Sequence, residues 1–193
     1  DGNATYQVGN REPKFLGGLN NSFTYKNWNL SFLLDFRKGG DILNGTEYQL
    51  AYYGLSRNTE NRGDKMLLNG IATNPATNQA EHVTREITLD QYYYQNIYAQ
   101  QTANFVETVN WLRLRSVNLS YDLPSAVFQK VKWIKGANFT LNATNLLLFT
   151  NYSGMDPEVS AAGAGVKGSG SVGVDYAGVP NTKSVTFGVN LKF

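Results

Sequence analysis

The sequence predicts an all-β fold: an antiparallel up-and-down segment of a transmembrane β-barrel, with about five strands and two long extracellular loops. Three observations support this prediction. Apolar and polar residues alternate with a period of two in several separate stretches. Short and long connections between these stretches follow one another in turn, and aromatic residues gather near the predicted strand ends.

The first two strands, near 14–25 and 28–37, form a hairpin around the two-residue turn Lys26–Asn27. This turn places Tyr25 opposite Trp28, so that the apolar residues of both strands fall on one face. A register error of one residue would scatter them over both faces, which is why the alternation fixes the pairing.

The third strand is predicted near 106–122. Val117, Leu119 and Tyr121 form its apolar face, whereas Leu112 and Leu114 upstream have the opposite phase. We interpret this reversal as a β-bulge or a change of environment within the strand.

The fourth and fifth strands are predicted near 136–149 and 183–193, and a possible helical turn at 125–132 precedes the fourth. The fifth strand ends on an aromatic residue. Such a strand fits the signal by which barrel proteins are recognised for assembly in the outer membrane. The residues predicted to form this signal are Val185, Phe187, Val189, Leu191 and Phe193.

The two long connections, 38–105 and 150–182, are predicted to be outer loops. In a meander alternate connections lie on the same side, so the short turns gather at one end and the long loops at the other. This arrangement places the C-terminus at the short-turn end, which we expect to be periplasmic. The glycine-rich stretch within 160–179 is interpreted as flexible outer loop rather than as a phosphate-binding loop, because it does not open a helix after a strand.

A soluble β-sandwich is the alternative fold, since its strands alternate in the same way. The predicted strands, about 10 to 13 residues long, are close to the roughly 9 to 11 that cross a bilayer obliquely. The aromatic residues also suggest two girdles, which favours the barrel. These are Tyr25, Trp28, Tyr121, Trp133 and Phe193 toward the short turns, and Phe15, Phe36, Trp111 and Phe149 toward the loops.

Composition bounds the function further. The 193 residues carry a net charge of +2, which is too small and scattered for a nucleic-acid surface, and there is no cysteine. No window approaches the about 18 apolar residues of a membrane helix, which excludes helical spans only. The chain starts without an initiator Met or a signal peptide, so we expect a processed chain or a fragment.

The sequence predicts no enzyme, no catalytic residues, no cofactor and no metal site. The only histidine, His82, lies in a segment predicted to be a polar loop, which leaves one possible base and one possible imidazole ligand. Asp156 and Glu158 could bind a cation, although a turn capped by Asp-Pro is the favoured interpretation.

Tyrosines in the first long loop are candidates for contact with a substrate or a partner, because flat amphipathic rings stack on sugars or proteins at low entropic cost. Packing of the loop on itself is the equal alternative. A short helix is predicted here with Thr46 as N-cap, Gln49 completing a capping box and Gly54 ending it. The candidate tyrosines are Tyr48, Tyr52, Tyr53, Tyr92, Tyr93, Tyr94 and Tyr98.

Several stretches resemble the SusC/RagA-like TonB-dependent outer-membrane transporters. The first hairpin and the Gly-Gly-Asp start of the loop after it resemble that family. A Leu-Arg-Leu-Arg core, which precedes a strand ending in Tyr-x-Leu-Pro, also resembles it. The third resemblance is a strand end with Asn-Leu, followed by Asp-Pro-Glu. The residues that carry the resemblance include Gly39, Gly40, Asp41, Arg113, Arg115, Asn145, Asp156 and Glu158.

This resemblance implies the last five strands of a plugged barrel of about 22 strands in the outer membrane of a Gram-negative bacterium. Such a piece cannot close alone, so the remainder of the barrel must come from elsewhere. The implied function is active import of a large nutrient, an oligosaccharide or a peptide. The implied partners are a SusD-like surface lipoprotein, the TonB complex through the missing N-terminal part, and outer-membrane lipid, with no nucleic acid. A barrel that acts as an adhesin or a protein-interaction hub is the alternative function.

Overall fold

A computed structural model describes residues 6–129, 133–159 and 173–193. The chain divides into two compact units, the first made of Asp1–Ile42 and Glu107–Phe193 and the second of Leu43–Val106. Among the described residues, no helix has the length and apolar character needed to cross a membrane. Most of the glycine-rich stretch predicted to be flexible loop, residues 160–172, lies outside the described residues.

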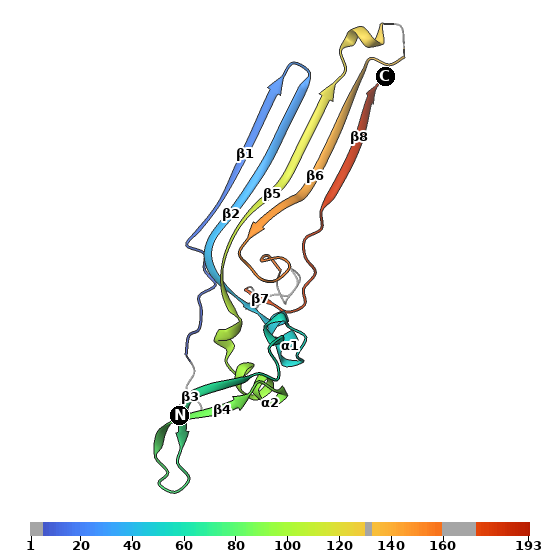
Figure 1. Ribbon diagram of the computed structural model, residues 1–193. Helices are drawn as coiled ribbons and strands as arrows, with labels where there is room; N and C mark the ends of the chain where they lie inside the picture. The colour runs from blue at the N-terminus through green and yellow to red at the C-terminus, as the bar shows by residue number, and fades with distance from the viewer. Residues whose placement is uncertain (1–5, 130–132, 160–172) are drawn as a thin grey trace, which may run out of the picture. The chain divides into compact units, whose positions relative to one another are not determined.

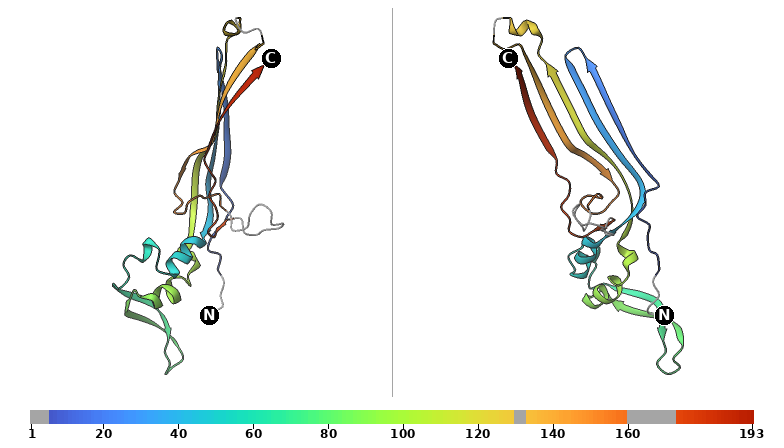
Figure 2. Two further views of the ribbon diagram at one scale, coloured as in Figure 1. Left: turned by 90° about the vertical axis from the view of Figure 1, so that its right-hand side faces the viewer. Right: turned by 180° about the vertical axis from the view of Figure 1, so that it is seen from behind.

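The first unit is built on one antiparallel sheet, whose long strands lie side by side in the order β1-β2-β5-β6-β8 (Figures 1 and 2). Its strands are β1 (Phe15–Tyr25), β2 (Trp28–Asn44), β5 (Val106–Asp122), β6 (Gly136–Thr150) and β8 (Ser184–Lys192), and the two-residue β7 (Val174–Asp175) pairs with β2. The all-β antiparallel meander predicted from the alternation is therefore present. β2 continues past the predicted end at 37 to Asn44.

The short connections lie together at one end of this sheet. The β1–β2 turn, the 3₁₀ helix η4 (Ser125–Phe128) that precedes β6, and the C-terminus are all at that end (Figure 1). The predicted helical turn at 125–132 is thus present as η4, and residues 130–132 of it lie outside the described part. The alternation of short and long connections predicted this arrangement.

The register of the first hairpin is the predicted one. Tyr25 is opposite Trp28 and Leu19 is opposite Leu34 along an uninterrupted ladder. Lys26 in the turn has a positive φ of 51°. All apolar residues that the alternation assigned to one face therefore share it.

The predicted irregularity in β5 is a register shift against β6. Leu114 is opposite Leu147, whereas Ser116 is opposite Thr144, so two residues of β6 face Arg115. An extra residue in one strand is the definition of a β-bulge. The phase reversal in the sequence thus predicted a real break in the ladder.

Side-chain contacts show that the reversal moves the arginines to the polar face. Arg115 binds Asp35 of β2, and Asn118 binds Ser31 of the same strand. Asp35 and Ser31 share a face, whereas Arg115 and Asn118 are three residues apart and would face opposite ways in a regular strand. The irregularity therefore lets both residues reach the same side of the sheet.

The opposite face of the sheet carries large apolar side chains that no other part of the described chain covers. Members on β1, β6 and β8 are all exposed: Phe15, Leu19, Phe23, Leu141, Leu147, Phe149, Val185, Phe187, Val189 and Leu191. A contiguous exposed surface of this kind is unusual for a soluble domain and indicates a further apolar contact.

The apolar core of the first unit lies near the loop-side ends of β2 and β5. Ile42, Val109, Trp111 and Tyr152 are buried together, and Leu148 packs against them. The prediction that Trp111 belongs to an exposed aromatic girdle was wrong. Because Trp111 precedes the irregularity, it shares the face of Arg113 rather than that of Leu112, and its ring lies 6.0 Å from the Arg113 guanidinium.

The second unit, predicted to be loop, has secondary structure of its own. It contains α1 (Gly45–Tyr52), the 3₁₀ helices η1 (Arg57–Thr59) and η3 (Thr102–Phe105), the hairpin β3 (Lys65–Thr73) and β4 (Ala80–Thr88), the helical turn α2 (Gln91–Tyr93) and the π-helix η2 (Tyr94–Tyr98). His82 therefore lies in β4, opposite Ile71, and not in a loop. The hairpin was missed because "AEHVTREIT" is too polar on both faces to show a period-two pattern.

The short helix predicted near 46–54 is α1, but its start was predicted wrongly. Asn44 is the N-cap, and its side-chain oxygen accepts a hydrogen bond from the Glu47 amide at 2.9 Å. Asparagine is among the best N-caps, so it starts the helix two residues before Thr46. Gly54, with a φ of +68°, ends the helix as predicted.

Candidate functional site

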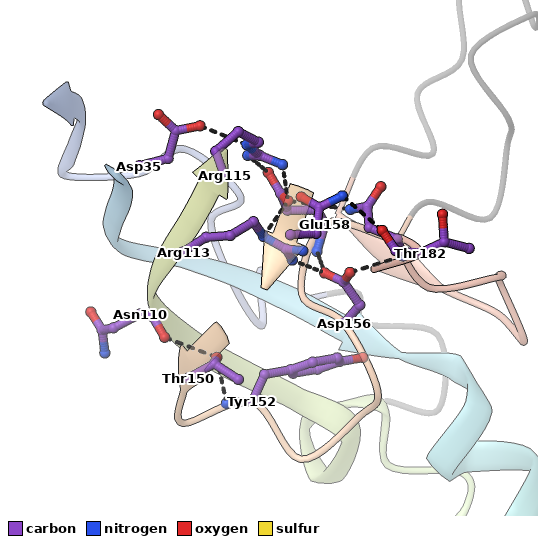
Figure 3. Close-up of polar contacts among 11 residues, drawn as sticks. Asp35, Asn110, Arg113, Arg115, Thr150, Tyr152, Asp156, Glu158 and Thr182 are labelled. Atoms are coloured by element: carbon purple, nitrogen blue, oxygen red, sulfur yellow. Dashed lines mark hydrogen bonds and ion pairs between the residues drawn. The ribbon is translucent and has the colours of Figure 1, made fainter. Parts of the chain in front are cut away.

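An ionic cluster on the polar face of the sheet brings together residues from three distant parts of the chain. It consists of Arg113 and Arg115 from β5, Asp35 from β2, and Asp156 and Glu158 from the segment after β6 (Figure 3). The four residues that the family resemblance singled out around these positions are thus in direct contact. Asp35 was not predicted as a site residue, although a carboxylate between Leu34 and Phe36 indicated a charged group on the polar face of the strand.

Arg115 is held by two carboxylates at once. Its Nη1 and Nη2 donate to the two carboxylate oxygens of Glu158 at 2.9 and 2.7 Å, and its Nε donates to Asp35 Oδ2 at 2.8 Å. The two-pronged contact uses the planar fork of the guanidinium, which a lysine could not reproduce.

Arg113 forms the most buried contact of the cluster. Its side chain is 2% exposed and that of Asp156 3%, and Nη2 donates to Asp156 Oδ1 at 2.5 Å. Its Nε lies 2.9 Å from Glu158 Oε2, an ion pair that lacks the alignment of a hydrogen bond. Two buried charges so close together compensate each other, and either one alone would be strongly unfavourable.

Asp156 also organises the chain around itself. Its Oδ1 accepts from the Glu158 amide at 3.0 Å, and its Oδ2 accepts from the Asn181 amide at 3.1 Å. This geometry agrees with the favoured interpretation, a turn capped by Asp-Pro. No group of three or more metal-binding side chains occurs among the residues that the structure describes. The two carboxylates bind the guanidinium groups of Arg113 and Arg115.

Asn145 marks the irregularity in β6. It has a positive φ of 52°, and its side-chain nitrogen donates to the Thr182 carbonyl at 3.0 Å. Asparagine tolerates this left-handed conformation better than most residues. The same residue thus bends the strand and holds the chain that returns toward β8.

The Gly39–Gly40–Asp41 motif bends β2 and clamps two other segments. Both glycines have positive φ, 76° and 85°. Asp41 accepts from the Thr108 hydroxyl at 2.6 Å and from the Asn10 amide at 2.7 Å. The Thr108 bond, with the Asn10 bond behind it, lowers the pKa of the Asp41 carboxyl. The motif therefore joins the segment before β1 to β5.

Tyr152 extends the polar anchoring beyond the end of β6. Its hydroxyl donates to Asp175 Oδ2 at 2.7 Å. Its amide donates to Thr150 Oγ1 at 3.0 Å (Figure 3). Burial, together with the bond to Asp175, raises the pKa of the Tyr152 hydroxyl. The phenol therefore stays protonated and keeps donating at physiological pH.

The candidate tyrosines of the second unit form two groups around Phe105. Tyr48 and Tyr98 each contact the Phe105 ring edge-on, with ring centroids 5.4 Å apart in both pairs. Tyr52 packs on Tyr48, and Tyr94 packs on Tyr98. Phe105 itself is almost completely buried. The two contacts with Phe105 and the contact between Tyr94 and Tyr98 are edge-to-face arrangements, which aromatic rings prefer, whereas the rings of Tyr48 and Tyr52 are tilted.

The tyrosines differ sharply in exposure. Tyr94 is 5% exposed and donates its hydroxyl to Asn61 Oδ1 at 2.8 Å, whereas Tyr53 and Tyr92 are 67% and 68% exposed. Burial raises the pKa of the Tyr94 and Tyr98 hydroxyls. The structure thus assigns Tyr94 to the interior of the unit and leaves Tyr53 and Tyr92 accessible to a ligand.

A cleft of about 450 Å³ lies within the second unit, beside Tyr92 and Tyr93. One wall is the β3–β4 hairpin and the other is α2 with η2. The lining is largely aliphatic, with Leu68, Val83, Ile87 and Ile97 among its members. This cleft was not predicted, because the β3–β4 hairpin that forms one of its walls was missed.

Known proteins resemble nearly the whole chain. TonB-dependent receptor P3 of Formosa agariphila is 28% identical over 187 residues, covering 96% of this chain and 17% of that protein. TonB-dependent receptor P39 of the same organism is 24% identical over 186 residues, again covering 96% of this chain and 17% of the relative. No profile of a known protein family matches the sequence.

Solved structures show the same fold. The RagAB peptide importer in its open-open state superposes with a TM-score of 0.61 at 22% identity, over 94% of this chain and 17% of the matched chain. The closed-closed state gives a TM-score of 0.58 at the same identity and coverage. Nearly the whole chain is thus similar to TonB-dependent receptors, and it shares the fold of the matched RagAB chains. The chain spans 17% of the length of those relatives, and its open sheet has the fold of part of a barrel.

Proposed function

We propose that this segment forms part of the wall and two outer loops of a barrel that imports a large nutrient across the outer membrane of a Gram-negative bacterium. The observation that carries the proposal is the division of the sheet into two faces. One face presents exposed aliphatic and aromatic side chains along β1, β6 and β8, which suits contact with lipid tails.

The other face is polar and bonded across the strands. Asn138 donates to Asp122 at 2.8 Å, and the hydroxyls of Thr144 and Ser184 are 2.7 Å apart. Ladders of amides and hydroxyls suit a hydrated lumen, where water satisfies their remaining hydrogen-bonding groups. The ionic cluster lies on this same face, away from the exposed apolar surface.

The remainder of the barrel is the first partner that the sheet requires. Among the described residues, β1 and β8 each pair with a neighbour on one side only. Unpaired backbone groups in hydrocarbon cost several kcal/mol each, so both edges must pair with further strands. The exposed ladder of β8 is the surface on which the barrel closes.

Import implies partners outside this segment: a plug driven by the TonB complex, and a SusD-like lipoprotein over the outer face. Support comes from the similarity to TonB-dependent receptors and to the RagAB peptide importer. The cargo is an oligosaccharide or a peptide. Tyr53 and Tyr92 are the tyrosines whose exposure suits contact with cargo or with the lipoprotein.

Uptake by whole cells tests this function. Cells that carry or lack the complete transporter gene are given labelled peptide mixtures and labelled oligosaccharide mixtures, with and without a protonophore. Accumulation of one class should require both the gene and the proton-motive force. Accumulation that is unchanged by deleting the gene would contradict import.

An adhesin or interaction hub is the second candidate, favoured by the exposed Tyr53 and Leu55 of the second unit. The same experiment separates the two functions. A hub binds its ligand at the cell surface whether or not the protonophore is present, and the label stays accessible to added protease or glycosidase. Import places the label inside, where those enzymes do not reach it.

A further inference from the structure

We propose that the aliphatic cleft of the second unit binds a ligand that carries a carboxylate on an apolar body, with Arg85 as the residue that recognises the carboxylate. The cleft is formed entirely within the second unit. The inference concerns binding alone and does not require that the transporter imports this ligand.

The first observation concerns Arg85. It lies in β4 opposite Leu68 and lines the cleft, yet its guanidinium forms no hydrogen bond or ion pair with any residue in the described part of the chain. Every other arginine has a carboxylate or carbonyl partner there: Arg11, Arg37, Arg57, Arg62, Arg113 and Arg115. A guanidinium is a planar fork that matches a carboxylate in two-pronged geometry.

Strand alternation places Arg85 among apolar neighbours. Leu68, Val83 and Ile87 share its face of the hairpin, because even positions of β3 pair with odd positions of β4. Glu86, the adjacent acidic residue, points to the opposite face and pairs with Lys65 at 2.7 Å. The Glu86 carboxylate is therefore paired with Lys65 and does not neutralise the Arg85 guanidinium.

The acidic residue of the cleft is also engaged. Asp90 lines the cleft, but its Oδ1 accepts from the Tyr93 amide at 2.9 Å and caps α2. Among the described residues that line the cleft, the Arg85 guanidinium is thus the charged group without a side-chain or backbone partner, and it attracts a negative charge on a ligand.

The apolar lining defines the rest of the ligand. A volume of about 450 Å³ falls in the range of small-molecule sites, roughly 300 to 1,000 Å³. Leu68, Val83, Ile87 and Ile97 suit an aliphatic or aromatic body. Two sources fit this chemistry: the C-terminal residue of a peptide with an apolar side chain, and a free carboxylic acid with an aryl or alkyl body.

Titration calorimetry of the complete transporter in detergent tests the proposal. One pair of probes is N-acetyl-Ala-Leu as free acid and as C-terminal amide, and the other is 4-phenylbutyrate and its amide. Arg85→Gln should weaken binding of the acids about tenfold or more, since a hydrogen-bonded charge is lost. The amides should bind the unmodified transporter no better than the acids bind this variant.

Two further variants keep the test sharp. Gly70 has open space where a Cβ would stand, and its backbone allows a side chain, so Gly70→Leu should fill the cleft and weaken the acids without removing charge. Arg57→Gln, at an exposed arginine outside the cleft, should leave affinity unchanged.

Each outcome of the calorimetry either assigns the ligand class or overturns the proposal. Binding of the peptide acid alone assigns the site to a peptide terminus, and binding of phenylbutyrate alone assigns it to free carboxylic acids. Equal binding of acid and amide, equal effects of Arg85→Gln and Arg57→Gln, or no binding of either acid would overturn the proposal. None of these results bears on the uptake experiment above, which can succeed or fail independently.

Discussion

Arg113 and Asp156 are 43 positions apart in the chain and form an ion pair in which neither side chain is more than 3% exposed. The contact joins β5 to the segment that follows β6. Removing one partner from a buried pair costs about 3 to 5 kcal/mol, because the other charge stays buried. We therefore expect Asp156→Ala to destabilise the assembled barrel by about 3 kcal/mol or more, measured by urea unfolding in detergent.

The matched control for this variant is the exposed pair Arg57–Glu60, with a separation of 3.8 Å. Glu60→Ala should cost less than about 1 kcal/mol, as exposed pairs usually do. Similar losses in the two variants would show that the buried pair has no special role in stability.

Gly40 is expected to tolerate no side chain. Its φ is +85°, and a Cβ there would lie 2.6 Å from the Arg11 carbonyl oxygen and still closer to the Arg37 guanidinium. Gly40→Ala should destabilise the protein by about 1 to 3 kcal/mol, the usual cost of a strained backbone position. Gly63→Ala is the control, since Gly63 has a similar φ of +93° with open space around it. A loss no larger than that of Gly63→Ala would remove the steric argument.

Leu141 and its neighbour Asn142 lie mid-strand on opposite faces of β6. If the exposed apolar face meets lipid, Leu141→Arg should cost about 2 to 4 kcal/mol and Asn142→Arg close to nothing. Folding into lipid vesicles measures both. Equal tolerance at the two positions would argue against a lipid-facing surface.

The absence of cysteine allows the topology to be read by labelling. Ala76→Cys, in the β3–β4 turn, should react with a membrane-impermeant maleimide on intact cells. Lys26→Cys, in the β1–β2 turn, should react only after the outer membrane is permeabilised. The unmodified transporter gives the background. The reverse pattern would invert the predicted orientation and place the C-terminus outside.

Phe193 is predicted to complete the outer-membrane assembly signal. Deleting Phe193 should lower the amount of folded, surface-exposed transporter and leave the precursor to periplasmic proteases. Lys192→Asp, on the polar face, should matter much less, because its side chain does not face the apolar surface. Quantifying heat-resistant folded protein in outer-membrane fractions compares them. Normal levels from the Phe193 deletion would assign the signal elsewhere.

The strands were predictable because the apolar and polar faces leave a period-two pattern that few alternatives can mimic. The register of β1 and β2 and the irregularity near Arg115 followed from that pattern alone. The face of the sheet on which Trp111 lies could not be predicted. The irregularity reverses the alternation within β5, and one aromatic residue does not show on which side of that reversal it belongs.

The sites were harder to predict than the strands. The resemblance marked Arg113, Arg115, Asp156 and Glu158, but the sequence could not show that they bind one another, because pairing across 43 positions is set by tertiary packing. The cleft beside Arg85 was invisible for a different reason. Both faces of β4 carry polar residues, so the sequence shows no period-two alternation there. The β3–β4 hairpin, which forms one wall of the cleft, was therefore not predicted.

The ionic cluster also fixes both stems of the connection between β6 and β8. Asp156 accepts from Asn181, and Asn145 donates to Thr182, so the outgoing and returning chains are fastened to the same stretch of β5 and β6. These bonds, like the pairing of β7 with β2, lie outside residues 160–172, so we expect an insertion within 160–172 to leave them in place. An epitope or a foreign binding loop inserted there should be displayed without altering the wall, since lengthening a closed loop costs little free energy.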